Sequence, residues 1–171
     1  NTRASSTTVH TKYIYTELEK MLLPIPVSTH KKTFATRALH QIADLIHKRS
    51  LVIIFSDMFD SHGDPDKLFS ALQHLRHNKH EVVLFHVTDK QKEIDFEYDN
   101  RPYRFIDMES GDELKVNPHE VRKEYVAAVK AFKKDLELKC GDYRIDFIEA
   151  DINQGFEQIL LPYLLKREKM Y

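Results

Sequence analysis

Apolar residues recur along the chain with two different spacings, and these predict alternating strands and helices. Val, Ile, Leu and Phe dominate residues 51–55, 80–88 and 143–150, as they do in strands buried inside a parallel sheet. Apolar positions three or four residues apart predict amphipathic helices over 9–23, 33–46, 65–78, 117–139 and 153–166. The alternation predicts an α/β fold, a parallel sheet flanked by helices on both faces, of Rossmann-like type.

A different pattern follows the second predicted strand. Ile94, Phe96 and Tyr98 alternate with acidic residues, and a turn sequence at 110–112 precedes a further short apolar stretch. Period-two alternation around a turn predicts antiparallel strands, so residues 93–116 are expected to form a hairpin insert at the rim of the sheet. The chain of 171 residues has the size of one domain, and we expect residues 1–171 to lie in a single domain.

Composition and charge argue against several classes of function. The chain carries 26 Lys and Arg residues against 27 Asp and Glu residues, so no global field favours nucleic acid or an anionic membrane surface. No apolar run approaches the ~20 residues that cross a bilayer, and the expected location is the cytoplasm. The single cysteine, Cys140, stands at the predicted end of a helix, where the helix dipole disfavours a thiolate, which argues against a catalytic cysteine.

Acidic residues follow each of the three predicted buried strands. Asp57, Asp89 and Asp151 would therefore meet at one edge of the sheet, where open parallel sheets bind their ligands. Carboxylate and hydroxyl oxygens, such as those of Asp57 and Ser56, are ligands that Mg²⁺ prefers. The alternative is that each aspartate ends a strand and caps the following turn or helix, as aspartate commonly does. The sequence leaves both interpretations open.

Two other kinds of chemistry match the sequence less well. Asp57 and Asp60 could act as a phosphoryl-transfer pair with one carboxylate as nucleophile, although Asp60 stands one residue further on than such a pair requires. His74 and His77 have a spacing that can bind zinc, but no convincing further ligand accompanies them or His80, so a solvated helix terminus is the preferred interpretation. The sequence has no Gly-rich phosphate loop, Gly-x-Ser-x-Gly, Cys-x-x-Cys or HExxH motif.

Three long stretches together resemble one known family. They are KKTFATRALHQIADLIHKRSLVIIFSDMFD, KLFSALQHLRHNKHEVVLFHVTD and YRIDFIEADINQGFEQILLPYLLKR. They are similar to the C-terminal part of bacterial proteins of the domain-of-unknown-function 58 family, which contain a von Willebrand factor type A-like domain. The resemblance implies that residues 1–171 are the C-terminal portion of a larger domain of this type, whose first three strands lie upstream of Asn1.

The resemblance also implies part of a metal-ion-dependent adhesion site. By position, Thr33 resembles the threonine of such a site, with Thr36 as a second choice, and Asp57 resembles its final aspartate. The chain departs from the pattern because it has no Asp-x-Ser-x-Ser turn. We therefore expect Mg²⁺ or Mn²⁺ to bind in the full-length protein, and we do not expect tight binding to this chain, since Mg²⁺ requires near-octahedral oxygen coordination.

The function implied by the resemblance is that of a non-enzymatic protein-interaction or adaptor module, assisting a MoxR-type AAA ATPase as its protein partner. In the absence of the upstream strands, the strand at 51–55 would form an exposed apolar edge, which favours pairing with a second copy of the chain. The competing hypothesis is a metal-dependent hydrolase or phosphotransferase that uses Asp57 and Asp60.

Overall fold

The α/β fold predicted from the sequence is confirmed in a computed structural model, which describes residues 5–23, 35–46, 49–58, 65–107 and 111–169. Strands β1 (Leu51–Ser56), β2 (Glu81–Thr88) and β5 (Asp146–Asp151) form a three-stranded sheet in the order β1-β2-β5. Both strand pairings are parallel, so the three strands end at the same edge of the sheet. We call this the carboxyl edge.

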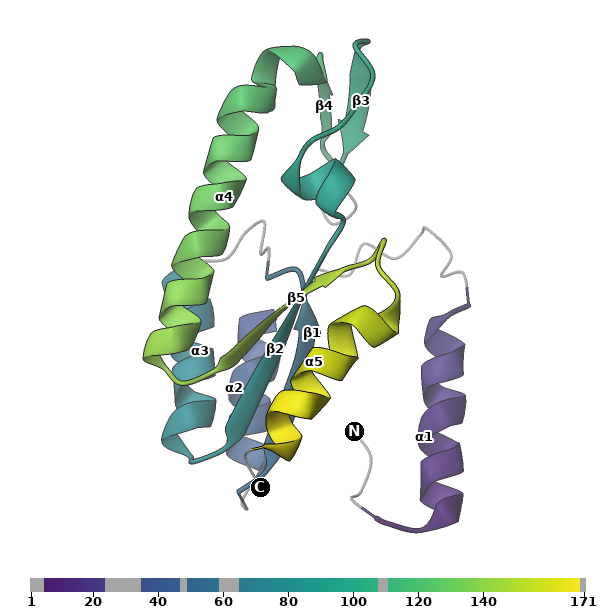
Figure 1. The fold of residues 1–171 in the computed structure, drawn as a ribbon, viewed down its shortest axis with the longest axis vertical. Coiled ribbons are helices and arrows are strands. Elements are labelled where there is room, and N and C mark those ends of the chain that lie inside the picture. The colour runs from purple at the N-terminus through teal and green to yellow at the C-terminus, as the bar shows by residue number, and fades with distance from the viewer. Residues whose placement is uncertain (1–4, 24–34, 47–48, 59–64, 108–110, 170–171) are drawn as a thin grey trace.

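Helices lie on both faces of the sheet, as the alternating pattern predicts (Figure 1). Helices α2 (Ala35–Leu45) and α3 (Pro65–His77) pack on one face, and α5 (Phe156–Glu168) lies on the other. Neighbouring residues of β2 point to opposite faces: Leu84 packs in the core under α2 and α3, whereas Phe85 packs with Tyr163 of α5. This central strand is buried on both faces because both layers of helices cover it.

Strand β1 differs from the prediction that residues 51–55 are buried on both faces. Val52 is buried, but the side chains of Leu51, Ile53 and Phe55 are 39%, 46% and 65% exposed. The prediction is wrong for this face because β1 is an edge strand of the described sheet and α5 packs on β2 and β5. The apolar edge at residues 51–55 that the family resemblance implies is therefore present in the described structure.

The insert between β2 and α4 (Pro118–Asp142) is only partly a hairpin. Strands β3 (Tyr103–Ile106) and β4 (Glu113–Val116) pair antiparallel, as predicted. The predicted strand at Ile94, Phe96 and Tyr98 is wrong, because Lys90–Ile94 forms a short π-helix, η1. The carboxylate of Asp89 accepts hydrogen bonds from two main-chain N–H groups of η1, which starts a helical turn at this point.

Helix α4 runs past the end predicted at residue 139. It continues to Asp142, so Cys140 and Gly141 lie inside it. The left-handed conformation that follows the helix falls on Arg144, with φ 55°, and not on Gly141. The extended helix places Cys140, which is completely buried, in the same core cluster as side chains of α3. This packing outweighs the tendency of Gly141 to end the helix.

Helix α1 (Thr8–Met21) confirms the first predicted helix, and the Thr7 side chain caps it by accepting a hydrogen bond from the His10 N–H. Its amphipathic pattern predicts a buried stripe, yet no residue of α1 is buried within the described structure. The large apolar side chains that remain exposed on α1 are those of Val9, Tyr13, Ile14, Tyr15, Leu18 and Met21. None of the helices in the described ranges is long and apolar enough to cross a membrane.

Candidate functional site at the carboxyl edge

A cavity of about 420 Å³ opens at the carboxyl edge of the sheet. It is lined by Phe55, Ser56, Asp57, Val87, Thr88, Asp89, Glu93 and Ile152. The parallel strands account for its composition, since each strand ends in a polar residue followed by an aspartate or ends in the aspartate itself. The structure therefore brings two of the three predicted aspartates, Asp57 and Asp89, to one cavity.

Asp89 and Asp151 are tied to main-chain and side-chain N–H groups. The Asp89 Oδ1 atom accepts from the N–H groups of Gln91 and Lys92 at 3.0 and 3.1 Å. The Asp151 Oδ1 atom accepts from the main-chain N–H groups of Asn153 and Lys90 at 3.1 and 3.2 Å. These N–H groups, Asn153 first, lower the pKa of Asp151 below its ordinary value.

The Asn153 side chain links these two aspartates directly. Its Nδ2 atom lies 2.9 Å from Asp89 Oδ1 and 3.1 Å from Asp151 Oδ1, so it donates to both carboxylates. For Asp89 and Asp151, the geometry thus supports the interpretation that they cap the turns after β2 and β5.

Asp57 is exposed and belongs to a sharply turned segment after β1. The Ser56 Oγ atom accepts a hydrogen bond from the Met58 N–H at 3.0 Å, and Met58 has the left-handed φ of 58°. The Met58 side chain is buried in the core, which anchors this turn. The segment thus holds the Asp57 carboxylate at the protein surface beside the cavity, where a ligand can reach it.

The predicted metal ligands, Asp57 and Thr33, cannot be placed together, because Thr33 lies outside the described residues, as does Asp60. Among the residues that are described, no group of three or more His, Cys, Asp or Glu side chains has the geometry to hold a metal ion. The metal site at Asp57 and Thr33 and the acid/base pair at Asp57 and Asp60 therefore stay predictions.

One residue next to the site, His86, was not predicted from the sequence; it contacts the main chain of Asp57 from the protein interior. His86 is 2% exposed, and its Nε2 atom lies 3.0 Å from the main-chain oxygen of Asp57. A carbonyl oxygen only accepts, so Nε2 carries the proton and donates. Burial lowers the pKa of His86, and the Lys133 charge acts in the same direction. A histidine within the apolar stretch VVLFHV was the available signal for this role.

This lowered pKa predicts that His86 weakens the fold in mild acid. In the unfolded chain His86 binds a proton near the ordinary histidine pKa of about 6.5, whereas in the folded protein it binds the proton only at lower pH. The free energy of unfolding should therefore fall as the pH drops through about 6.5. His86→Gln keeps a donor for the Asp57 carbonyl and cannot titrate. Urea denaturation between about pH 7 and pH 5 should show a shallower pH dependence for His86→Gln than for the wild type. The matched variant at an exposed histidine, His77→Gln, should keep the wild-type slope, and equal slopes for all three proteins would contradict the prediction.

The histidines at the end of α3 are less solvated than predicted. His80 is 1% exposed, and its Nδ1 atom accepts from the Ser50 N–H at 3.3 Å. The His80 Nε2 atom has no hydrogen-bond partner among the described residues. His74 lies next to His40, with the two Nδ1 atoms 3.3 Å apart. The interpretation of a solvated helix end is therefore wrong for His80, because the strand that follows carries it into the interior.

The single thiol is not a catalytic candidate. Cys140 is completely buried in α4, and burial raises the pKa of its thiol to about 12. A thiol with this pKa is almost entirely protonated at neutral pH, so it is a weak nucleophile. The structure gives burial as the main cause, in place of the helix-end dipole expected from the sequence.

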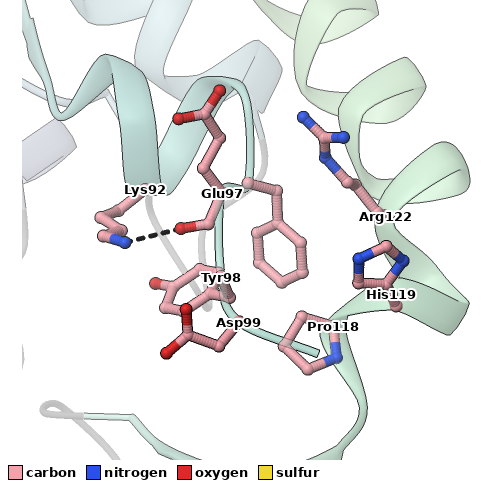
Figure 2. Close-up of a pocket in the computed structure, with 8 residues that line it drawn as sticks. Lys92, Glu97, Tyr98, Asp99, Pro118, His119 and Arg122 are labelled. Atoms are coloured by element: carbon pink, nitrogen blue, oxygen red, sulfur yellow. Dashed lines mark hydrogen bonds between the residues drawn. The ribbon is translucent and has the colours of Figure 1, made fainter. Parts of the chain in front are cut away.

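A second cavity, of about 340 Å³, lies in the insert, away from the predicted site (Figure 2). Lys92, Tyr98 and Asp99 lie on one side, and His119 and Arg122 of α4 lie on the other. The Lys92 Nζ atom donates to the main-chain oxygen of Glu97 at 2.6 Å. Cationic and anionic side chains are mixed in this cavity, so it has no single preferred ligand charge. Sequence reasoning missed it because its walls come from two segments about 20 residues apart.

Fold and cavity together define the class: an α/β protein with helices on both faces of a parallel sheet, a candidate ligand site at the carboxyl edge, and a small insert. Residues 4–135 match the family described as "Protein of unknown function DUF58", and the chain therefore belongs to the DUF58 family. The match ends within α4, before β5 and α5. No curated protein and no solved structure matches the chain significantly.

Proposed function

We propose that the chain is a non-enzymatic protein-interaction module that binds its partner through the exposed face of β1. The observation that carries the proposal is the apolar surface of Leu51, Ile53 and Phe55 on an edge strand. A large apolar patch on a soluble protein commonly marks a protein interface. An edge strand also offers main-chain N–H and C=O groups to which a partner strand can add.

Phe55 is a suitable anchor for such an interface. Its ring is 65% exposed but is stacked on the buried Phe85 ring, with centroids 4.8 Å apart and planes 13° apart. Contact with a buried ring restricts the motion of Phe55 before a partner arrives. Aromatic residues held in this way lose little entropy on binding, which is why they often dominate the energy of an interface.

The proposed partner is a MoxR-type AAA ATPase, and this proposal comes from the family resemblance. The charges of the chain are nearly balanced, 26 basic against 27 acidic residues, which suits an interface based on apolar contact more than one based on long-range attraction. The exposed edge also suits a second copy of the chain, and the experiment must distinguish the two occupants.

The test compares Phe55→Asp with Leu138→Asp, a change at an equally apolar and similarly exposed side chain of α4. If β1 is the interface, Phe55→Asp should weaken binding to a purified MoxR-type AAA ATPase by about 30-fold, as expected for loss of a ~2 kcal/mol anchor, and Leu138→Asp should not. Biolayer interferometry measures the affinity. Equal binding by wild type and Phe55→Asp would contradict the proposal, and self-association abolished by Phe55→Asp in sedimentation velocity would assign the edge to a second copy.

A divalent metal forms a second, separable part of the proposal. We infer that Asp57 and Thr33 contribute ligands to Mg²⁺ or Mn²⁺ in the full-length protein, and the position of Asp57 beside the carboxyl-edge cavity supports this. Calorimetric titration of the full-length protein with Mn²⁺ should give heat of binding that Asp57→Ala removes. Identical heats for the wild type and Asp57→Ala would exclude Asp57 as a ligand.

The enzymatic alternative rests on the same cavity. Asp57 is exposed there, and the cavity also contains the hydroxyl-bearing residues Ser56 and Thr88. Metal-stimulated turnover of a panel of phosphate esters, lost in Asp57→Asn, would favour a hydrolase or phosphotransferase that uses Asp57 and Asp60. Absence of turnover together with binding to the ATPase favours the adaptor.

A further inference from the structure

An apolar cavity of about 440 Å³ lies in the insert, between the β3–β4 hairpin, η1 and the first turns of α4. Its aromatic walls are Phe96, Tyr98, Phe105 and Tyr125, and its aliphatic walls are Leu114, Val116 and Val121. Figure 1 shows the hairpin and η1 beside the N-terminal half of α4, beyond the end of the sheet. None of the residues that line this insert cavity comes from β1. It shares Glu93 with the carboxyl-edge cavity and shares Lys92, Phe96 and Tyr98 with the cavity of about 340 Å³.

The aromatic rings hold one another in fixed positions. The ring centroids of Phe96 and Tyr125 are 4.2 Å apart, and Tyr98 meets Phe105 edge to face at 5.3 Å. Phe96 is buried, and its main chain has the left-handed φ of 49°. Such contacts restrict the rings in the absence of a ligand, so the walls of the insert cavity are preformed.

Two acidic residues, Glu93 and Glu124, and one basic residue, Lys92, line the insert cavity, so its lining carries a net negative charge. Among the described residues neither carboxylate forms an ion pair with a Lys or Arg side chain. Glu93 does accept a hydrogen bond from the Asp89 N–H at 2.9 Å. The pKa values of Tyr98 and Tyr125 are raised, chiefly by burial and further by the Glu93 carboxylate, which also places negative charge beside the rings.

One aromatic ring of the insert cavity already carries a cation. The Lys92 Nζ atom lies 4.8 Å from the centroid of the Tyr98 ring. This distance is within the range of a cation–π interaction, in which the negative face of the ring attracts the charge. The Tyr98 ring thus accepts a cation of the chain itself, and this is the kind of contact that the cavity would offer to a positive group of a ligand.

We propose that the insert cavity binds an arginine side chain of a partner polypeptide. Arginine has an aliphatic stem, which the walls formed by Leu114, Val116 and Val121 can cover. Its planar guanidinium stacks on aromatic faces and is more weakly hydrated than an ammonium group, so it is the cation that an aromatic pocket desolvates most easily. Glu93 and Glu124 supply the complementary charge. The inference adds a second contact to the proposed adaptor function but does not depend on β1 binding.

The experiment uses three capped tripeptides that differ only in the central residue. Acetyl-Gly-Arg-Gly-amide, the same peptide with citrulline, and the same peptide with leucine are titrated into the full chain, and aromatic NMR shifts of Tyr125 and Phe96 report binding. Citrulline keeps the shape of arginine and lacks its charge. The arginine peptide should bind at least about fivefold more tightly than either neutral peptide. Equal affinity of the arginine and citrulline peptides, or no shift with arginine, overturns the proposal.

Variants that remove negative charge test whether the arginine peptide binds in the insert cavity. The double variant Glu93→Gln, Glu124→Gln should lower the affinity for the arginine peptide by about fivefold or more, because the carboxylates are lost while their size and the acceptor for the Asp89 N–H are kept. Glu120→Gln, on an exposed acid of the same helix that does not line the cavity, is the matched control and should bind like the wild type. An equal loss in both variants would show only a general charge effect and would reject the site. If the chain did not bind the ATPase through β1 but still bound the arginine peptide, only the adaptor proposal would be rejected.

Discussion

Phe85→Ala is expected to lower the free energy of unfolding by about 3–5 kcal/mol, the largest effect of any substitution considered for this chain. Phe85 lies in the central strand β2, is 1% exposed, and is one of the largest fully buried side chains. It stacks on Phe55 and meets Tyr163 of α5 edge to face at 5.8 Å. Its removal would leave a cavity between the sheet and α5 that the neighbouring strands cannot close. Urea denaturation followed by far-ultraviolet circular dichroism measures the change.

The matched control is Phe55→Ala, in the same ring stack. Phe55 is 65% exposed, so its truncation removes little surface from the interior and should cost about 1 kcal/mol or less. The pair separates the two functions of the stack: Phe85 supports the fold, and Phe55 is offered to a partner. If the two variants lost equal stability, Phe55 would be a core residue and the proposed binding surface on β1 would be wrong.

The parallel sheet could be predicted because its strands carry a strong local signal. The β2 stretch is apolar on both faces and is buried on both faces. The β1 stretch is just as apolar, yet only one of its faces packs against the core, with Val52 buried and Ile54 partly buried. The sequence pattern shows which side chains of a strand are apolar enough to be buried. Whether a helix covers them depends on which strand lies at the edge of the sheet and on which strands α5 packs. That information is tertiary and is not present in the local pattern.

The insert shows the limit of periodicity. Ile94, Phe96 and Tyr98 alternate with acidic residues as a strand would, but Ile94 ends a π-helix and Phe96 has a positive φ. The three side chains still gather on the interior side of the insert, as the pattern indicates, since Ile94 and Phe96 are buried and Tyr98 contacts Phe96. The apolar positions were thus identified correctly, and the conformation was not, because the Asp89 cap competes with strand formation.

The candidate site was predictable in position but not in the role of each residue. Parallel strands must end at one edge, and this alone brings Asp57, Asp89 and Asp151 to the same edge of the sheet. The sequence could not show that Asn153 joins Asp89 to Asp151, since this contact depends on how two loops meet. Asp57 differs in that its main-chain oxygen accepts a hydrogen bond from the buried His86, a contact that the sequence did not predict. Its side chain is exposed beside the carboxyl-edge cavity, which makes Asp57 the best candidate for a ligand contact at this edge.

Arg76→Met is expected to lower the free energy of unfolding by about 2–4 kcal/mol, because it removes two charge-assisted hydrogen bonds that link the end of α3 to the residue before β2 and to the C-terminal cap of α4. The Arg76 Nε atom donates to the Tyr143 carbonyl at 3.0 Å, and its Nη1 atom donates to the His80 carbonyl at 2.5 Å. Methionine keeps the aliphatic volume but leaves both carbonyl oxygens without this donor.

Two control variants separate the effect on stability of the two donors of the planar Arg76 guanidinium from the effect of its positive charge. Arg76→Lys keeps the charge and can reach only one of the two carbonyls at a time, so its loss of stability should be about half as large. Arg37→Met, at an exposed arginine of α2, should change the free energy of unfolding by less than about 0.5 kcal/mol. Urea denaturation of the four proteins at one pH gives the comparison. A wild-type midpoint for Arg76→Met would mean that water replaces the guanidinium at both carbonyls, and the end of α3 would then be the solvated terminus that the sequence alone suggested.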